Sequence, residues 1–500
     1  MISLRRTVKN ILIVGASQVT VWVATFAFTV VQARYLDPAR FGQLALALAY
    51  AGFLTIFVDF GTTTLVSRMV AQRSGQEDGA VAATLVVRSA LWLVALPALM
   101  LGALVLGYDA ELRGAILVLA VAALFVACGG AVSAYLQGRE EFSLASLSAV
   151  AYRIVAAVVG ITILVLVPTP SLPLIALAFL IGAVLSAGIL FVALGRQHGI
   201  RWDLRPRRAA ALFRSAVPIG AYLVVATFYF NVDLVILERL APAENVGWYA
   251  AAYRLFNAAT IVEAIVVVRV LYPVFSRLSL GPQAELRLVI AKAISFLAIV
   301  GCAAGLVIVL CADQIVGILY SADRYAPAAN ALRLLGPGLL LLYLNSVIGY
   351  ALFALGCEKR LLVMATAFAF FNVAANLIAI PRFAQDGAAA VTTLTELGLL
   401  MWTIRITPRD LLTGESVRTV AKAALAAVAA GLVGMLSGAN TIVTMVPLVL
   451  VVYAAGIVSL RAIGPADFRA IAALMNTRRR ERTAVEPVGQ PVHEEVRSNG

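Results

Sequence analysis

The stretch LDPARFGQLA, from Leu36 to Ala45, returns about 204 residues later as LAPAENVGWYA, from Leu240 to Ala250. In both copies a long apolar run ends, a short turn with a proline follows, and a glycine (Gly42, Gly247) opens the next apolar run. This recurrence indicates a duplicated membrane unit. Polytopic transporters are often built from two related bundles, with the transported molecule handled between them.

Composition places the chain among integral membrane proteins. Its 500 residues are 62% hydrophobic and only 13% charged, with a mean hydropathy of +0.96. A soluble domain is about half apolar and a quarter charged. A spanning helix needs about 20 predominantly apolar residues. We expect fourteen such helices near 11–32, 42–66, 84–106, 114–136, 144–167, 171–194, 217–238, 247–272, 289–311, 333–355, 361–380, 387–405, 419–438 and 441–460.

Basic residues predict the orientation, because Lys and Arg are retained on the cytoplasmic side. With both termini inside, about 31 of the 39 basic residues fall on the cytoplasmic side. The densest groups are the loop Arg196 to Arg214 and the tail Arg478 to Arg482. Topology and anionic lipid headgroups therefore explain the net charge of +13 better than nucleic-acid binding does.

Further sequence pairs extend the repeat. Arg88 aligns with Lys292, and AYLQGREEF (Ala134 to Phe142) resembles LFALGCEKR (Leu352 to Arg360). The offset grows between these pairs, which predicts an insertion in the loop Asp313 to Arg333. Six helices per unit return the chain to the same side, so the halves must be parallel. We expect lobes at 1–195 and 217–405, a basic linker at 196–216, two additional helices at 406–461 and a disordered cytoplasmic tail at 462–500.

The chain has no visible means of binding a metal, a nucleotide or another cofactor. Its four cysteines lack CxxC spacing, and its two histidines lie in a predicted loop and in the tail. Neither GxxxxGK[ST] nor GxGxxG occurs. We expect the energy source to be a proton or sodium gradient, the membrane potential or downstream consumption of the product.

Five motifs carry a family resemblance. They are ARYLDPARFGQLALA (Ala33 to Ala47), VDFGTTTLVSR (Val58 to Arg68), NVDLVILERLAPAENVGWYAAAYRL (Asn231 to Leu255), YPVFSRL (Tyr272 to Leu278) and FNVAANLIAIPRFAQDGAAAVTTLTE (Phe371 to Glu396). In order and spacing the chain resembles the Wzx-type polysaccharide and O-antigen flippases of the multidrug/oligosaccharidyl-lipid/polysaccharide exporter (MOP) superfamily. Each motif alone is weak, since it consists mostly of small and apolar residues.

The resemblance implies two six-helix lobes around a central cavity, in the bacterial inner membrane. It implies a flippase that moves undecaprenyl-diphosphate-linked oligosaccharide by alternating access, for the synthesis of O-antigen, capsule or exopolysaccharide. Its partners would include the lipid-linked substrate, a polymerase and glycosyltransferases. One alternative is a cation-coupled multidrug antiporter of the same superfamily. A membrane glycosyl ligase or polymerase is disfavoured, because the largest outer loop, near Ala312 to Leu332, is small and holds no histidine.

Charges inside the predicted spans are candidates for the site, since they usually face a cavity or a partner. A diphosphate needs cations, and arginine offers a planar fork for phosphate oxygens. We expect Arg34 and Arg254 to bind it. Arg34 could instead extend to the outer interface, and Arg254 could pair with Asp233. Arg153 is another charge within a predicted span.

The acidic and amide residues of the second half suggest ion coupling. Glu263 lies near mid-span among apolar neighbours, about 2.5 helical turns from Arg254, so the two face opposite sides of a straight helix. We expect Glu263 to be a protonatable coupling site or one end of an interhelical bond. Asn372 and Asn376 share one helix face, and Glu396 lies mid-span. We assign these residues and Asp233 to the cavity or to ion coupling. Asp59 is expected to pair locally with Arg68.

Overall fold

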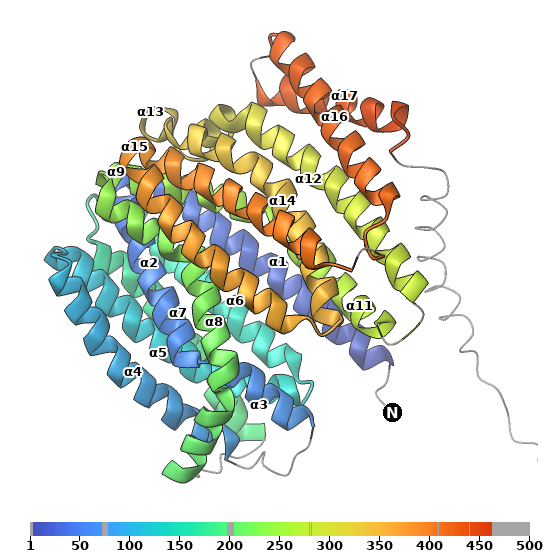
Figure 1. Ribbon diagram of the computed structural model, residues 1–500. Coiled ribbons are helices and arrows are strands. Elements are labelled where there is room, and N and C mark those ends of the chain that lie inside the picture. The colour runs from blue at the N-terminus through green and yellow to red at the C-terminus, as the bar shows by residue number, and fades with distance from the viewer. Residues whose placement is uncertain are drawn as a thin grey trace, which may run out of the picture.

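The computed structural model describes residues 4–72, 79–197, 205–279, 281, 283–408, 410–439 and 441–462, and the expected tail at 462–500 lies outside them except for Ala462. Every regular element in these ranges is a helix (Figure 1). The helices are α1 (Leu4–Tyr35), α2 (Pro38–Asp59), α3 (Thr62–Ala71), α4 (Ala80–Val105), α5 (Ala110–Gly138), α6 (Phe142–Leu166), α7 (Leu172–Gln197), α8 (Pro206–Leu240), α9 (Ala243–Ala259), α10 (Ile261–Glu263), the π-helix η1 (Ala264–Leu271), α11 (Tyr272–Leu278), α12 (Gln283–Leu319), α13 (Ala322–Tyr325), α14 (Ala328–Ala354), α15 (Glu358–Ile406), α16 (Gly414–Leu436) and α17 (Ile442–Ser459).

Twelve helices within the described ranges are long and apolar enough to cross a membrane. One of them, α15, is two antiparallel arms, because the backbone leaves the helical conformation at Ala384 (φ 47°) and Thr403 then returns to contact Met364. The 35-residue α8 is not among the twelve. The multi-pass membrane fold is confirmed. The count of fourteen stays a prediction that requires α8 and both arms of α15 to cross.

The most extensive helix contacts lie within one half of the chain, although α2 also packs against α9 and α8. Helix α5 packs against α7, α2, α3 and α4, and α6 packs against α7 and α1; in the second half α14 packs against α12, α15 and α9. Helices α16 and α17 lie on the outside of α12 (Figure 1). Gly305 permits the close approach of α12 and α14, since a Cβ there would lie 2.8 Å from the carbonyl oxygen of Gly336.

Three expected boundaries differ from the structure. The expected helix 42–66 breaks at Phe60 and Gly61, which both have positive φ, because α8 crosses there at Ile219 and Gly220. Helix α8 begins at Pro206, so half of the expected linker 196–216 is helical, and residues 198–204 lie outside the described ranges. The expected loop 313–333 is mostly the end of α12 and α13.

The two copies of the duplicated turn meet at one end of the bundle, which we call the outer end following the predicted orientation. A Cβ on Gly42 would lie 2.6 Å from the backbone nitrogen of Gly247, and a Cβ on Gly247 would lie 1.8 Å from the carbonyl oxygen of Pro38. Helices α2 and α9 therefore touch backbone to backbone. Only glycine permits this approach.

The insertion of the second half covers this contact. Tyr325 donates a hydrogen bond to the carbonyl of Leu36 at 3.3 Å, and Arg324 donates to the carbonyl of Arg34 at 2.7 Å. Trp248, which follows Gly247, donates to the carbonyl of Arg324 at 2.9 Å. The insertion thus ties the first copy of the turn to the second half of the chain.

Candidate functional site

A cavity of about 320 Å³ lies between the two halves, directly inward of the glycine contact. Its lining comes from α1, α2, α6 and α7 of the first half and from α8 and α9 of the second. Helix α2 contributes Ala45 and Leu48, one to two turns after Gly42, and α9 contributes Tyr253 and Arg254 at the same stage after Gly247. The two copies of the duplicated turn therefore lie at the outer side of the cavity.

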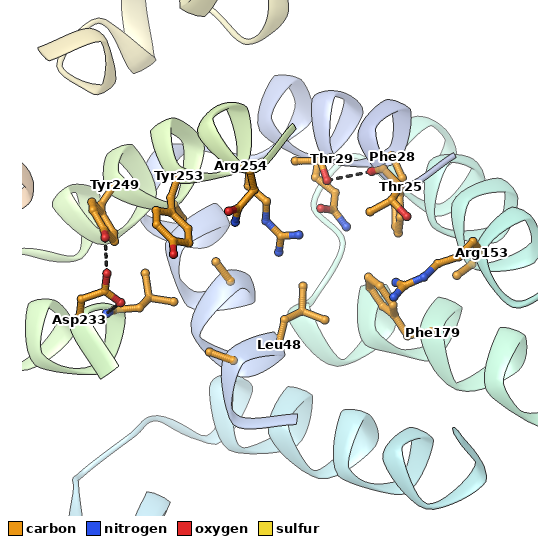
Figure 2. A pocket seen from close by; sticks show the side chains of 17 residues that line it. Thr25, Phe28, Thr29, Leu48, Arg153, Phe179, Asp233, Tyr249, Tyr253 and Arg254 are labelled. Atoms are coloured by element: carbon orange, nitrogen blue, oxygen red, sulfur yellow. Dashed lines mark hydrogen bonds between the residues drawn. The ribbon is translucent and has the colours of Figure 1, made fainter. Parts of the chain in front are cut away.

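Two arginines, one from each half, line this cavity. Figure 2 shows the guanidinium groups of Arg153, on α6, and Arg254, on α9, reaching into the same space from opposite sides. Neither forms an ion pair or hydrogen bond with any described residue, although Arg153 lies 4.8 Å from the centre of the Tyr152 ring. Both charges are therefore available to an anion. Sequence reasoning noted Arg153 but did not assign it to the site, because it gave no indication of the direction in which the side chain points.

Helix α1 adds polar groups to the same lining. The Nε2 atom of Gln32, whose side chain is only 3% exposed, has no hydrogen-bond partner among the described residues. Thr25 and Thr29 donate their hydroxyl protons to carbonyls of their own helix, at 2.7 and 2.9 Å. Their oxygens can accept, and Gln32 can donate, hydrogen bonds from the cavity wall. A buried amide donor without a partner favours a polar ligand.

Asp233 lines the cavity but does not pair with Arg254. Its carboxylate accepts hydrogen bonds from the hydroxyl of Tyr249 and from the backbone nitrogen of Leu234, the latter at 2.8 Å. Tyr253 stands between this pair and Arg254 (Figure 2). The ion pair considered as an alternative for Arg254 is therefore wrong, because Asp233 turns toward α9 one helical turn earlier.

Arg34 does not line the cavity. Its Nε donates to the carbonyl of Leu319 at 3.0 Å, and its Nη2 donates to the carbonyl of Ile318 at 2.5 Å. A cation beside the free carbonyls of a helix C-terminus is stabilised by the helix dipole. The structure therefore gives Arg34 a role in holding α1 to the end of α12, and we leave it out of the proposed binding site.

The remaining acidic and amide residues form a second polar group within the second half. Asn345 of α14 donates to the carboxylate of Glu396 at 2.8 Å, and the adjacent Ser346 donates to Glu263. Neither carboxylate has a basic partner among the described residues. Glu263 accepts a hydrogen bond from α14, whereas Arg254 lines the cavity; the helix between them is interrupted at Thr260.

Asn372 and Asn376 lie in the same region on the first arm of α15. Asn376 donates to the Oδ1 of Asn372 at 3.0 Å, and Asn372 donates to Thr395 at 3.3 Å. The Oδ1 atoms of Asn376 and Asn345 are buried and have no hydrogen-bond partner among the described residues. Within the described ranges no three His, Cys, Asp or Glu side chains converge as a metal site would require.

Asp59 pairs with Arg88, so the pairing expected with Arg68 is wrong. Arg88 is fully buried, and besides Asp59 it donates to Thr62 at 2.9 Å, to Thr63 at 2.7 Å and to the carbonyl of Ala127. This cluster joins α2, α3, α4 and α5 where α2 ends. Spacing along the chain could not reveal a partner on another helix.

A hydrogen-bonded latch joins the halves at the outer end. The hydroxyl of Tyr108 donates to Glu238 at 3.0 Å, and Arg239 donates to the carbonyl of Leu106 at 2.6 Å while lying 4.8 Å from the centre of the Tyr108 ring. Burial, a bond to Tyr50 and nearby Glu238 raise the pKa of Tyr108, so its hydroxyl stays protonated as a donor. These contacts hold the two halves together at the outer end.

Comparisons with known proteins agree on this architecture. The family model described as "Polysaccharide biosynthesis protein" matches residues 7–279. A search of curated protein sequences found no match. The chain is similar to the solved structure of the lipid II flippase MurJ in an inward closed conformation, with a TM-score of 0.75 and 14% identity over 90% of this chain and 99% of that one.

Two further solved structures show the same fold. An inward-facing multidrug resistance MATE family transporter of the MOP superfamily has a TM-score of 0.63 and 15% identity, over 77% of this chain and 94% of its own. A MOP superfamily transporter from Pyrococcus furiosus, described by the reverse polarity of its binding pocket, has a TM-score of 0.57 and 16% identity, over 80% and 92%. At these identities the likeness is one of fold.

Proposed function

We propose, from the premise that the chain belongs to the polysaccharide biosynthesis protein family, that it is a flippase for lipid-linked oligosaccharides. The substrate is an undecaprenyl-diphosphate-linked oligosaccharide, which moves from the cytoplasmic to the outer leaflet of the bacterial inner membrane. On the outer side it supplies the assembly of O-antigen, capsule or exopolysaccharide. A lipid-linked substrate is also named for the lipid II flippase of similar fold.

The observation that carries this proposal is the pair Arg153 and Arg254, one from each half, which line one cavity and form no ion pair with a carboxylate among the described residues. A diphosphate that leaves water must have its charge compensated. Guanidinium groups do this with short, charge-assisted bonds to phosphate oxygens. Gln32 offers a further donor. The same two cations repel an organic cation, which argues against the multidrug antiporter.

Alternating access can be explained by the positions of the two arginines, because Arg153 belongs to the first half of the chain and Arg254 to the second. While the outer end is closed, the diphosphate can bridge Arg153 and Arg254. Separation of α2 from α9 at the outer end moves the two halves apart, so each phosphate then keeps only one arginine. Loss of this bridge weakens binding on the side where the substrate is released. The geometry thus links opening to release without any covalent chemistry.

The polar group of the second half supports coupling to a proton or sodium gradient. Glu263 and Glu396 lie in apolar helices and have no basic partner among the described residues, and Asp233, Asn372 and Asn376 add further oxygens. The Oδ1 atom of Asn376, which has no hydrogen-bond partner among the described residues, is an oxygen of the kind that coordinates a bound cation.

The test is reconstitution in liposomes, comparing movement of a labelled undecaprenyl-diphosphate oligosaccharide with efflux of a cationic dye. Arg153→Ala and Arg254→Ala should each lower the flipping rate about 10- to 100-fold, since a hydrogen bond to a charged group contributes about 1.5–3 kcal/mol. The Lys variants should lose less, because the charge remains. Arg418→Ala, at an exposed position of α16, is the matched control. Dye efflux without lipid movement would reverse the assignment.

A further inference from the structure

An eight-residue π-helix, η1, begins directly after Glu263 in the segment that lines the cavity. π-helical stretches are rare, and they are found mostly as single turns at functional sites. A π-helix makes hydrogen bonds to the fifth residue, so it takes roughly 4.4 residues per turn instead of 3.6. Every residue within and beyond η1 is therefore rotated relative to the position it would have in a continuous α-helix.

This rotation decides where Arg269 points. The cavity face of α9 is centred on Asn257, with Arg254 and Tyr253 to either side. Twelve residues of α-helix would place Arg269 roughly 120° from Asn257. The helix is interrupted at Thr260, and the last six residues, 264–269, have π winding, which lowers the rotation per residue. The π-helix thus turns Arg269 back toward the face of the cavity arginine Arg254.

The contact of Arg269 agrees with this rotation. Its Nη2 donates a hydrogen bond to the Oε1 of Gln18 at 3.3 Å, across from the second half to α1 of the first. Gln18 lies two turns before Thr25 on α1, and Thr25, Thr29 and Gln32 line the cavity. Helical spacing places all four polar residues of α1 within an arc of about 60°. Gln18 therefore lies on the same face of α1 as the polar residues of the cavity, about two turns closer to the inner end.

Arg269 is charged, and no carboxylate neutralises it among the described residues. Its one hydrogen bond is to an uncharged amide, within an apolar segment, Ala243–Leu278, long enough to cross the membrane. It lies fifteen residues after Arg254, about 20 Å closer to the inner end. A charge within a span usually faces a partner or a polar path. Arg269 lies next to the polar face of α1 and has no carboxylate partner among the described residues.

We infer that Arg269 and Gln18 form a second phosphate-binding site, inward of the cavity, which binds the diphosphate of the lipid-linked substrate before it reaches Arg153 and Arg254. This inference rests on the proposed function and extends it. The guanidinium group binds the phosphate oxygens, and the amide of Gln18, released from Arg269, donates a further hydrogen bond. The polar face of α1 then leads the headgroup to the cavity.

Transport kinetics test this site in proteoliposomes, with fluorescent undecaprenyl-diphosphate N-acetylglucosamine as the probe. Arg269→Ala should raise the apparent KM at least tenfold and leave kcat within twofold, because it weakens the first binding of the substrate and leaves the later movement across the membrane unchanged. Arg269→Lys should keep KM within threefold. Gln18→Ala should raise KM less than Arg269→Ala. The matched control is Arg277→Ala, eight residues further along the same segment, which should behave as wild type. Gel filtration of each variant checks folding.

Binding of farnesyl diphosphate to the purified protein separates this inference from the proposed function. Arg254→Ala should retain measurable binding, and adding Arg269→Ala should weaken that binding at least tenfold, with Arg153 as the remaining cation. Binding that depends on Arg269, with no lipid movement by the wild type, would end the proposed function and leave the site standing. Normal KM and normal binding in Arg269→Ala, with active wild type, would overturn the site. A fall in kcat at unchanged KM would do the same, since it would make the Arg269 and Gln18 contact a gate.

Discussion

Gly247→Ala should hold the outer end of the protein open. The added Cβ would lie 1.8 Å from the carbonyl oxygen of Pro38 and 2.6 Å from its carbonyl carbon. Both are backbone atoms, so no side-chain rotation can relieve the clash. Ordinary contact begins near 3.4 Å, so α2 and α9 must separate by about 1.6 Å to accept the methyl group.

The magnitude follows from the cost of overpacking, which is typically about 1–3 kcal/mol. The cost falls on the closed state alone, because the two turns no longer touch once the outer end opens. A penalty of about 2 kcal/mol changes the ratio of open to closed protein about 30-fold. Gly42→Ala, whose Cβ would lie 2.6 Å from the nearest atom, should have a smaller effect in the same direction.

The assay is labelling of a cavity cysteine from outside the cell with a membrane-impermeant maleimide. Asn257→Cys, which lines the cavity, serves as the reporter. The four natural cysteines are free thiols and are first replaced by serine: Cys128, Cys302, Cys311 and Cys357. Gly247→Ala should then label about 30-fold faster than the parent. Gly52→Ala is the matched control, since a Cβ at this glycine of α2 would meet nothing within 4 Å.

Equal labelling rates in Gly247→Ala, Gly52→Ala and the parent, with all three proteins folded, would refute the reasoning. That result would mean that α2 and α9 absorb the methyl group without opening, or that the duplicated turns do not close the cavity. Faster labelling in Gly52→Ala would also contradict the reasoning, because a methyl group at Gly52 does not touch the contact between α2 and α9.

The remaining predictions concern stability, coupling and orientation. Arg88→Ala should destabilise the fold by about 3–5 kcal/mol, because it leaves the Asp59 carboxylate without its partner; thermal unfolding in detergent measures this, and the double variant Arg88→Leu/Asp59→Leu should be the more stable of the two. Collapse of the proton gradient should slow the wild type and have less effect on Glu263→Gln; a gradient-independent wild type would argue against proton coupling. A cysteine at Lys359 should resist labelling from outside while one at Asp323 reacts, and the reverse pattern would invert the topology.

The class of the protein could be read from the sequence because a bilayer responds to local properties of the chain. The length and apolarity of each run determine whether it can span. The positions of Lys and Arg bias the orientation. The repeat of Leu36 to Ala45 at Leu240 to Ala250 survives in the sequence because each copy needs the same turn. These properties predicted the all-helical membrane fold and its duplication without any knowledge of packing.

The direction of each charged side chain could not be read in the same way. Arg254 and Arg153 line the cavity, whereas Arg34 binds the end of α12 and Asp59 binds Arg88. Each outcome depends on how two helices are rotated against each other. Spacing along a regular helix predicts only how its side chains point relative to one another. A break such as that at Thr260, or a π-helix such as η1, changes even these relative directions.

The sequence by itself determined that this is a membrane protein with basic and acidic residues inside its apolar runs, and it predicted a duplication, because hydrophobicity, charge and repetition are properties of the chain itself. Only the tertiary structure decided that Gly42 and Gly247, the matching residues of the repeat, lie in backbone contact, next to a cavity with two arginines that have no ion-pair partner among the described residues. The physical reason is that backbone contact and cavity lining are created by the packing of helices distant in sequence. The repeat in the sequence identified the two turns, and the packing of α2 against α9 brings them into contact.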